Sequence, residues 1–290
     1  MQIINGKKLR DGILAKVKKE VALLKFQPVF TDVLVGNDPA SVQYVRIKKA
    51  MAEAVDLSFY KANFPSSITT DELIREIKIL NKVPNMCGII IQLPLPEHID
   101  RQRALDSIDP KLDVDCLGKV ASGKFYDSYD SKSDLGFPTA LSCMAILDSL
   151  HLDWPGKKIV VLGQGTLVGR PVTHMLRLRG LPVETIDNRT ENISELLKNA
   201  DVIVSGIGRG KFINGQKVKK DIIIIDAGTS EDNGAIVGDV DLESVKNIAS
   251  YVSPVPGGVG PVTVAMLLNN VLSVAKSLEK SRDDSAESNI

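Results

Sequence analysis

Three polar residues recur at helical spacing in the first sixth of the chain: Ser41, Tyr44 and Lys48. In a helix that begins after Asp38, these side chains would fall in one stripe. The neighbouring face is apolar and contains Ala40, Ile47, Met51 and Ala54. Lys48 should therefore lie at the margin of a buried face, where a partly desolvated amine can act as a base near neutral pH. Most helix lysines are solvated surface residues, so the spacing alone leaves both interpretations open.

A second candidate site is the loop from Ser253 to Thr263, which reads Ser-Pro-Val-Pro-Gly-Gly-Val-Gly-Pro-Val-Thr. Two prolines restrict φ before the turn, and three glycines leave a stretch of backbone without side chains. Pro261 then opens a helix, where its missing N–H costs nothing. Such a loop lets backbone amides contact a flat or anionic ligand. The alternative is a tight connection between a strand and a helix.

A third candidate is a glycine-rich turn, Gly163-Gln164-Gly165-Thr-Leu-Val168-Gly169, between an apolar strand and a helix. In a dinucleotide site the first glycine permits the turn, the second lets the backbone approach pyrophosphate, and the third packs against the helix. The helix N-terminus then offers N–H groups to the phosphates. The spacing is one residue longer than G-x-G-x-x-G, and a turn without a ligand is the alternative.

Asp187 follows the next predicted strand, at the position that selects the cofactor. A carboxylate there accepts both ribose hydroxyls and repels a 2′-phosphate, which favours NAD over NADP. Arg189 complicates the inference because it could accept that phosphate, and Asp187 could instead be a turn residue. Small residues end two later strands, and we expect them to keep the cofactor crevice open. The residues predicted to bind the cofactor are Gly163, Gln164, Gly165, Val168, Gly169, Asp187, Asn188, Gly208 and Thr229.

The composition restricts the class of protein. Of 290 residues, 43% are hydrophobic, and 36 Lys and Arg balance 36 Asp and Glu. This zero net charge and 4% aromatic residues argue against a nucleic-acid partner. We find no continuous apolar run of membrane-spanning length and no signal peptide. Three separated cysteines and three histidines predict reduced thiols, a cytoplasmic location and no metal site.

Strands and helices are predicted to alternate, which favours parallel sheets with helices on both faces. The predicted strands are 29–35, 57–63, 88–93, 158–162, 182–186, 202–204 and 222–226, and the predicted helices 39–55, 70–80, 139–150, 168–179, 193–198 and 261–278. Residues 112–135 show weak periodicity and should connect two domains. The polar segment 280–290 should be disordered.

Four motifs in this order resemble the bifunctional methylenetetrahydrofolate dehydrogenase/cyclohydrolase family. They are Val35-Gly-Asn-Asp-Pro-Ala-Ser41-Val-Gln-Tyr44-Val-Arg-Ile-Lys48, Ile91-Gln92-Leu-Pro-Leu-Pro96, Asp113-Val-Asp115 and Pro254-Val-Pro-Gly-Gly-Val-Gly-Pro261. The likeness runs from about Ile4 to Leu278. It implies an α/β fold of two domains, with a folate-binding catalytic domain (1–138 and helix 262–279) and a Rossmann-type domain (139–261) that has a doubly wound parallel sheet. The substrate is implied to lie in the cleft between them.

The resemblance also implies roles for particular residues. Lys48 would transfer protons, Tyr44 would stack on the pterin, Gln92 would hydrogen-bond Lys48, and Asp115 would bind the pterin's polar edge. A neutral amide beside such a lysine makes physical sense, because a carboxylate would hold it charged. The residues implied to bind the substrate are Ser41, Tyr44, Ile91, Gln92, Leu93, Asp115, Pro256, Gly257, Gly258, Val259 and Gly260.

The implied activity is oxidation of 5,10-methylenetetrahydrofolate with NAD(P)⁺ and hydrolysis of the product to 10-formyltetrahydrofolate, in one-carbon metabolism and purine biosynthesis. The implied assembly is a homodimer. Gln164-Gly165 and Asp187-Asn188 depart from the family pattern where the 2′-phosphate is held, and Cys116 replaces a glycine. Three alternatives remain: a cyclohydrolase with an impaired dehydrogenase, a shikimate-dehydrogenase-like oxidoreductase, and a non-catalytic nucleotide sensor.

Overall fold

The computed structural model describes residues 1–131, 134–232 and 234–287. Within them the chain divides into two compact units, each with its own sheet. Unit 1 comprises Met1–Asp11 and Thr139–Met266, and unit 2 comprises Gly12–Pro138 and Leu267–Ile290. The expected domain division differs at the N-terminus. Strand β1 (Gln2–Ile3) pairs in parallel with β11 (Tyr251–Val252), which places the first residues in unit 1.

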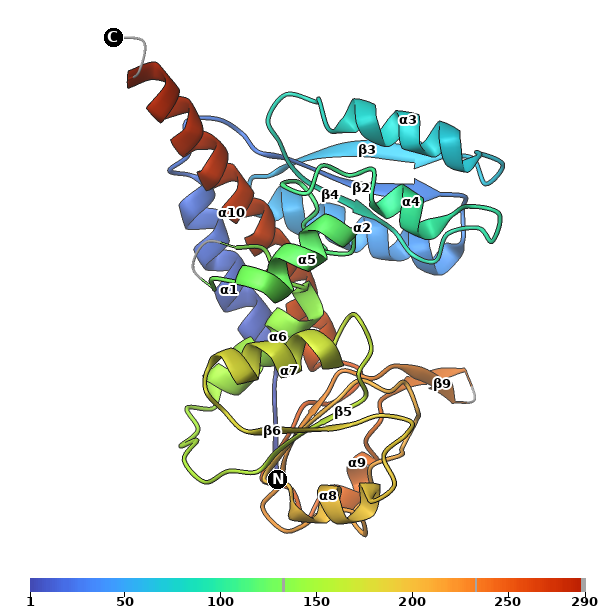
Figure 1. The fold of residues 1–290 in the computed structure, drawn as a ribbon, viewed down its shortest axis with the longest axis vertical. Helices are drawn as coiled ribbons and strands as arrows, with labels where there is room; N and C mark the ends of the chain where they lie inside the picture. Colours follow the sequence, from blue (N-terminus) through green and yellow to red (C-terminus); the bar gives the residue numbers. More distant parts are fainter. Residues whose placement is uncertain (132–133, 233, 288–290) are drawn as a thin grey trace. The chain divides into compact units, whose positions relative to one another are not determined.

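Unit 2 contains the parallel sheet β3–β2–β4, formed by Ser58–Phe64, Val29–Val35 and Met86–Ile91. Both faces of this sheet are buried. On one face Val33 and Ile91 pack with α3 (Thr70–Leu80) and α4 (Arg101–Leu105). On the other, Phe30 and Ile90 pack with α1 (Gly6–Val21), α2 (Pro39–Ala54) and α10 (Val259–Glu287). Figure 1 shows α3 and α2 on opposite sides of the strands. Two covered faces explain why β4 reads as a continuous apolar run, whereas β3 at the edge of the sheet includes exposed polar residues.

Unit 1 contains the second sheet, whose strand order is β1–β11–β8–β7–β5–β6. Every pairing in it is parallel. The strands not yet given are β5 (Ile159–Leu162), β6 (Val183–Ile186), β7 (Val202–Ser205) and β8 (Ile223–Asp226). The helices are α6 (Pro138–Ser149), α7 (Gly169–Leu178), α8 (Ile193–Asn199) and α9 (Leu242–Val245). Figure 1 shows α6 and α7 on one side of this sheet and α8 and α9 on the other, and the mixed α/β class with parallel sheets is confirmed.

Several features differ from the sequence prediction, which did not include the elements α1, α4, α9, β1 and β11. Segment 112–135 contains a helix, α5 (Lys119–Ser128), whose buried face is only Ala121 and Phe125, so its periodicity is weak. An antiparallel hairpin joins β9 (Ser230–Asp232) to β10 (Ala235–Val237). The expected disordered tail is helical as far as Glu287, and 288–290 lie outside the described residues.

The contacts of helix α10 account for two of its properties, its ordered polar end and its apolar composition. Its polar end is attached to unit 2, because Arg282 lies 4.6 Å over the Phe26 ring and Asp283 pairs with Lys25 at 2.8 Å. By length and composition it is also the one described helix apolar enough to cross a membrane. However, its apolar residues pack in the core of unit 2, as Leu268, Val271 and Ala275 do. Burial in a protein core therefore accounts for that composition.

Candidate active site

Lys48 is the centre of a small polar cluster in unit 2. Its Nζ donates to Gln92 Oε1 at 2.8 Å and to Asp32 Oδ2 at 2.7 Å. The Lys48 side chain is 13% exposed and the Asp32 side chain is 0% exposed. The amine is therefore largely withdrawn from water, as the helix pattern predicts, and it has two anchored partners.

Each member of the cluster is positioned by regular structure. Lys48 lies in the third turn of α2, which begins at Pro39 and is capped by Asp38, whose Oδ2 accepts from Ser41 N at 2.8 Å. Gln92 directly follows β4, and its Nε2 donates to the Leu93 carbonyl at 2.7 Å. That bond aims Oε1 of Gln92 at the amine. The predicted contact between Gln92 and Lys48 is therefore present.

Asp32 is the residue that sequence reasoning missed. It lies in the middle of β2, where alternation places it on the same face as Phe30, which packs against α2. A charged residue inside an otherwise apolar strand was the available signal. Burial raises the pKa of Asp32, and the facing Lys48 ammonium opposes that rise. The expected amide neighbour of Lys48 is present, and a buried carboxylate that was not expected contacts the amine as well.

Asp115 lies close enough to Lys48 for their charges to interact. Burial raises its pKa to about 7, Lys48 opposes the rise, and the nearby Asp113 and Asp32 add to it. Asp113 has a structural contact instead: its Oδ2 accepts from Gly118 N at 2.7 Å, where α5 begins. Cys116 adopts φ 58°, a region that favours glycine, so the cysteine keeps the glycine-like turn after Asp115.

The other predicted substrate residues of unit 2 differ in their placement. Tyr44 is 54% exposed, so its ring has a free face one turn of helix before Lys48. Ser41 is buried and serves the cap of α2 through Asp38. Ile91 is 2% exposed within the core beside α3, on the face of β4 opposite to Gln92. The structure therefore brings Lys48, Gln92 and Asp115 together, places Tyr44 one helical turn before Lys48, and leaves the side chain of Ile91 out.

The Pro/Gly loop belongs to unit 1, between β11 and α10. Gly257 adopts φ 109°, and its carbonyl accepts from Gly6 N at 3.0 Å. A side chain on Gly258 would contact the Pro254 carbonyl at 2.7 Å, whereas Gly260 has open space around it. Val259 is buried and Pro256 is exposed. The loop is thus a tight strand–helix connection with exposed backbone at Pro256 and Gly260.

The glycine-rich turn of unit 1 connects β5 to α7, as predicted. Gly163 adopts φ 91°, and a side chain on Gly169 would collide with the Gly163 carbonyl. A β-carbon at Gly165 would have no atom within 4 Å, so the backbone there is open to a ligand. The turn fits a dinucleotide: two glycines are required by its shape, and the third leaves room beside the N-terminus of α7.

Asp187 directly follows β6, and Asn188 beside it is exposed. Asp187 Oδ2 pairs with Arg189 at 2.9 Å, and hydrogen bonds from Arg189 lower the pKa of Asp187. Gly208 and Thr229 follow β7 and β8 and are neighbours, since a side chain on Gly208 would meet the Thr229 carbonyl at 3.4 Å. The Gln164 amide turns back to the Gly163 carbonyl at 2.8 Å, and Val168 is buried. The predicted cofactor residues therefore surround the strand ends of one sheet.

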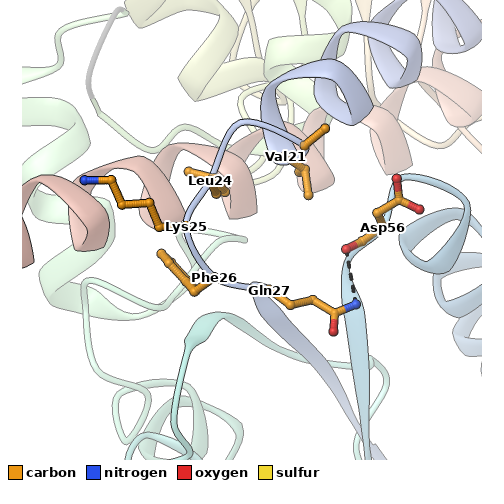
Figure 2. A pocket seen from close by; sticks show the side chains of 7 residues that line it. Val21, Leu24, Lys25, Phe26, Gln27 and Asp56 are labelled. Carbon is orange, nitrogen blue, oxygen red and sulfur yellow. Dashed lines mark hydrogen bonds between the residues drawn. The ribbon is translucent and has the colours of Figure 1, made fainter.

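A shallow surface pocket lies elsewhere in unit 2. It is lined by Val21, Ala22, Leu24, Lys25, Phe26, Gln27 and Asp56 (Figure 2). It contains none of the predicted site residues, and Gln27 spans it with a bond to the Asp56 carbonyl.

Comparison with known proteins identifies the family. A model described as the catalytic domain of tetrahydrofolate dehydrogenase/cyclohydrolase matches residues 4–115, and one described as its NAD(P)-binding domain matches residues 138–279. The bifunctional protein FolD of Nautilia profundicola is 39% identical over 284 residues, covering 97% of this chain and 99% of the relative.

Solved structures agree. The bifunctional FolD methylenetetrahydrofolate dehydrogenase/cyclohydrolase of Campylobacter jejuni is 34% identical with a TM-score of 0.90, covering 96% of this chain and 99% of that one. The Trypanosoma brucei enzyme, solved with NADP and an inhibitor, is 33% identical with a TM-score of 0.88, covering 95% and 97%. A shikimate dehydrogenase is 13% identical with a TM-score of 0.51, so the shikimate alternative is not better supported. The chain therefore belongs to the tetrahydrofolate dehydrogenase/cyclohydrolase family, whose two domain models it matches.

Proposed function

We propose that this chain oxidises 5,10-methylenetetrahydrofolate to the methenyl form with a nicotinamide cofactor and hydrolyses that form to 10-formyltetrahydrofolate. The observation that carries the proposal is the withdrawn Lys48 amine, held by Gln92 next to the exposed Tyr44 ring and Asp115, in a chain of this family. Tyr44 suits a planar substrate, Asp115 suits a substrate with a polar edge, and Lys48 suits a reaction that requires proton transfer.

The residues of unit 2 can hold the folate in a defined orientation. The exposed face of Tyr44 suits stacking of the planar pterin. The Asp115 carboxylate suits the amino-pyrimidine edge, which presents N–H donors. These contacts would fix the folate ring, and a nicotinamide nucleotide held by the glycine turn of unit 1 would supply the hydride acceptor. The folate nitrogen supplies the electrons for that step, so the protein mainly orients the reactants.

Hydrolysis of the methenyl cation needs proton transfer, which Lys48 can supply. Water adds to the cationic carbon and loses a proton to the amine. The resulting ammonium returns a proton to a ring nitrogen as the carbon–nitrogen bond breaks, and the hydroxyl of the adduct releases its remaining proton to solvent, which gives the neutral formyl product. Gln92 keeps the amine aimed throughout, because its own amide is fixed by the Leu93 carbonyl.

We propose NAD as the preferred cofactor. The support is Asp187, whose lowered pKa keeps it negatively charged at the end of β6, where a 2′-phosphate would be repelled. Arg189 is engaged by Asp187 at 2.9 Å and is not held toward a phosphate by any other described group.

We also propose a cellular location and an oligomeric state for the protein. The three cysteines are buried and carry no disulfide, which supports a reducing cytoplasm. By its resemblance to the family we propose a homodimer that supplies formyl groups for purine biosynthesis. Light scattering tests the assembly: a homodimer has twice the mass of the chain.

The deciding experiment measures cofactor reduction and methenyl hydrolysis in parallel, with NAD and with NADP. Both reactions should proceed, and reduction should be faster with NAD. Hydrolysis without any cofactor reduction would instead support a cyclohydrolase with an impaired dehydrogenase, and cofactor binding without either reaction would support a sensor.

Lys48→Met provides the residue-level test. The variant should lose methenyl hydrolysis while it still binds the cofactor, since Lys48 belongs to unit 2 and the glycine turn to unit 1. Unchanged hydrolysis would remove Lys48 from the mechanism.

A further inference from the structure

Asp32 is the charged group that contacts Lys48, and the proposed function gives it no role. Its Oδ2 accepts from Lys48 Nζ at 2.7 Å, and its side chain is fully buried. Its other oxygen, Oδ1, is also buried and has no hydrogen-bond partner among the described residues. A buried carboxylate with one unpartnered oxygen is costly to keep in the middle of an apolar strand. Such a group requires an explanation beyond packing.

We propose that Asp32 is a positioning residue of the hydrolase reaction, which orients the Lys48 amine and exchanges a proton with it. This inference rests on the proposed role of Lys48. In the exchange the Lys48 N–H bond breaks, an O–H bond forms on Asp32 Oδ2, and an ion pair becomes a neutral pair. The amine is then free to accept a proton from the attacking water. When the ammonium has passed that proton to the folate nitrogen, Asp32 returns the stored one.

The geometry supports this exchange in three ways. The distance of 2.7 Å from Nζ to Oδ2 is that of a short charge-assisted hydrogen bond. Burial raises the pKa of Asp32, which brings its neutral form closer in free energy to the ion pair. The third support is the second contact of Nζ, with Gln92, because the amide holds the amine in place in either protonation state.

The polar and charged groups near Lys48 come from β2, from the segments after β4 and before α5, and from its own helix. Asp32 faces it from β2 and Gln92 from the end of β4. Asp115 acts on it through space, and Asp113 and Asp32 act on Asp115 in turn. On its own helix Tyr44 lies four residues before it, and Lys49 pairs with Glu53 at 3.7 Å. Because Asp32 contacts Lys48 directly, a change at Asp32 also changes the charge that surrounds the amine.

The test is Asp32→Asn, which keeps the shape of the side chain and removes its charge and its ability to store a proton. We expect the turnover number for methenyl hydrolysis to fall by about 10- to 100-fold, with little change in KM. One limb of the pH–rate profile reflects loss of the proton that Asp32 and Lys48 share. In the variant this limb should move to lower pH by about one to three units, because the carboxylate that favours the Lys48 ammonium is gone. The rate of cofactor reduction should change much less.

Three further variants make the result decisive. Asp32→Val replaces the carboxylate with a side chain suited to an apolar strand and should show the same loss. Thr31→Val is the matched control: Thr31 is equally buried in β2, and its hydroxyl bonds the Tyr60 carbonyl rather than Lys48. It should keep the rate and the profile. In a Lys48→Met background, Asp32→Asn should cause no further loss, because the two residues act as one unit.

The possible results separate failure of the inference about Asp32 from failure of the proposed function. An unshifted profile with normal hydrolysis in Asp32→Asn overturns the inference and leaves the proposed function intact. Faster hydrolysis also overturns it, because Asp32 would then hold Lys48 in an unreactive charged form. Absence of both reactions in the unaltered protein contradicts the proposed function itself.

Discussion

At the scale of residues, the candidate site combines one amine, that of Lys48, with two nearby carboxyl groups, those of Asp32 and Asp115. Asp32 is paired with Lys48 and fully buried, whereas Asp115 is partly exposed and has a pKa raised to about 7 by burial. The contact of Asp32 suits its proposed action on the lysine, and the partial exposure of Asp115 suits its proposed contact with substrate. The two surroundings therefore suit different proposed roles for the same functional group.

The raised pKa of Asp115 predicts a pH-dependent affinity for folate. Only the carboxylate accepts well from the amino-pyrimidine edge, so KM for methylenetetrahydrofolate should rise as the pH falls through about 7. Steady-state kinetics across this range measure the effect. Asp115→Asn should have a higher KM that no longer changes with pH, and a variant that keeps the dependence would assign it to another group.

The proposed preference for NAD depends on a single carboxylate. Asp187→Ser removes the carboxylate and releases Arg189, which is now paired with it at 2.9 Å. The ratio of kcat/KM for NADP to that for NAD should rise at least about tenfold, since a repulsion is lost and a phosphate partner is gained. Adding Arg189→Ala should reverse most of the gain in NADP use. Equal ratios in Asp187→Ser and the unaltered protein would rule out Asp187 as the selector.

At the scale of elements, helix α10 holds the segment that carries Asp115. Asn270 is 2% exposed, and its Nδ2 donates to the Val114 carbonyl at 2.8 Å and to the Gly136 carbonyl at 2.7 Å. Val114 precedes Asp115 directly. The helix therefore holds the backbone next to Asp115, the carboxylate proposed to bind the pterin, by a bond from a distant part of the chain.

Asn270→Leu tests this attachment. Two buried carbonyl groups would lose their donor, so the free energy of unfolding should fall by about 2–5 kcal/mol. KM for folate should rise as well, because the Asp115 backbone is no longer fixed. Chemical denaturation and steady-state kinetics measure the two effects. Asn269→Leu is the control, since no described bond involves the Asn269 side chain and its stability should change little; an equal loss there would point to general damage to the helix.

At the scale of the whole molecule, buried carboxyl groups make stability depend on pH. Asp226, at the end of β8, is 1% exposed and accepts from Gly228, Asp239 and Val240 backbone N–H groups. Burial, followed by the charge of Asp239, raises its pKa to about 7. The folded state therefore binds this proton more tightly than the unfolded chain does, over the range between about 4 and 7.

The sign of the effect follows from this difference. Where the folded state holds more protons, the free energy of unfolding falls as the pH rises, so the contribution of Asp226 is lost between about pH 4 and about pH 7. Denaturation at a series of pH values should show a flatter dependence for Asp226→Asn than for the unaltered protein. Asp221→Asn, an exposed position where asparagine also adopts positive φ, should keep the original slope. A steep dependence that survives in Asp226→Asn would contradict this assignment.

Much of this architecture could be predicted because its signals are local. Residues 29–35 form a strand and residues 70–80 form a helix, as predicted. Both predictions succeed because the spacing of apolar residues and the capping residues lie within a few positions of each other in the sequence. The capping box of Thr69 and Glu72 is an example. Two missed elements bury little surface: β1 has two residues, and α5 buries one narrow stripe. Helix α1 was missed as well, although its Val17 and Val21 are buried in the core.

The sequence alone determined the two sheets, the glycine turn and the helix stripe of Tyr44 and Lys48, because each depends on neighbours in the chain. Only the tertiary structure decided what surrounds Lys48. Asp32 and Gln92 lie 16 and 44 residues from it, and they meet it because β2, β4 and α2 pack in one register. Long-range packing also withdraws water from Asp115 and Asp226, and that desolvation, which no local pattern encodes, sets their pKa values.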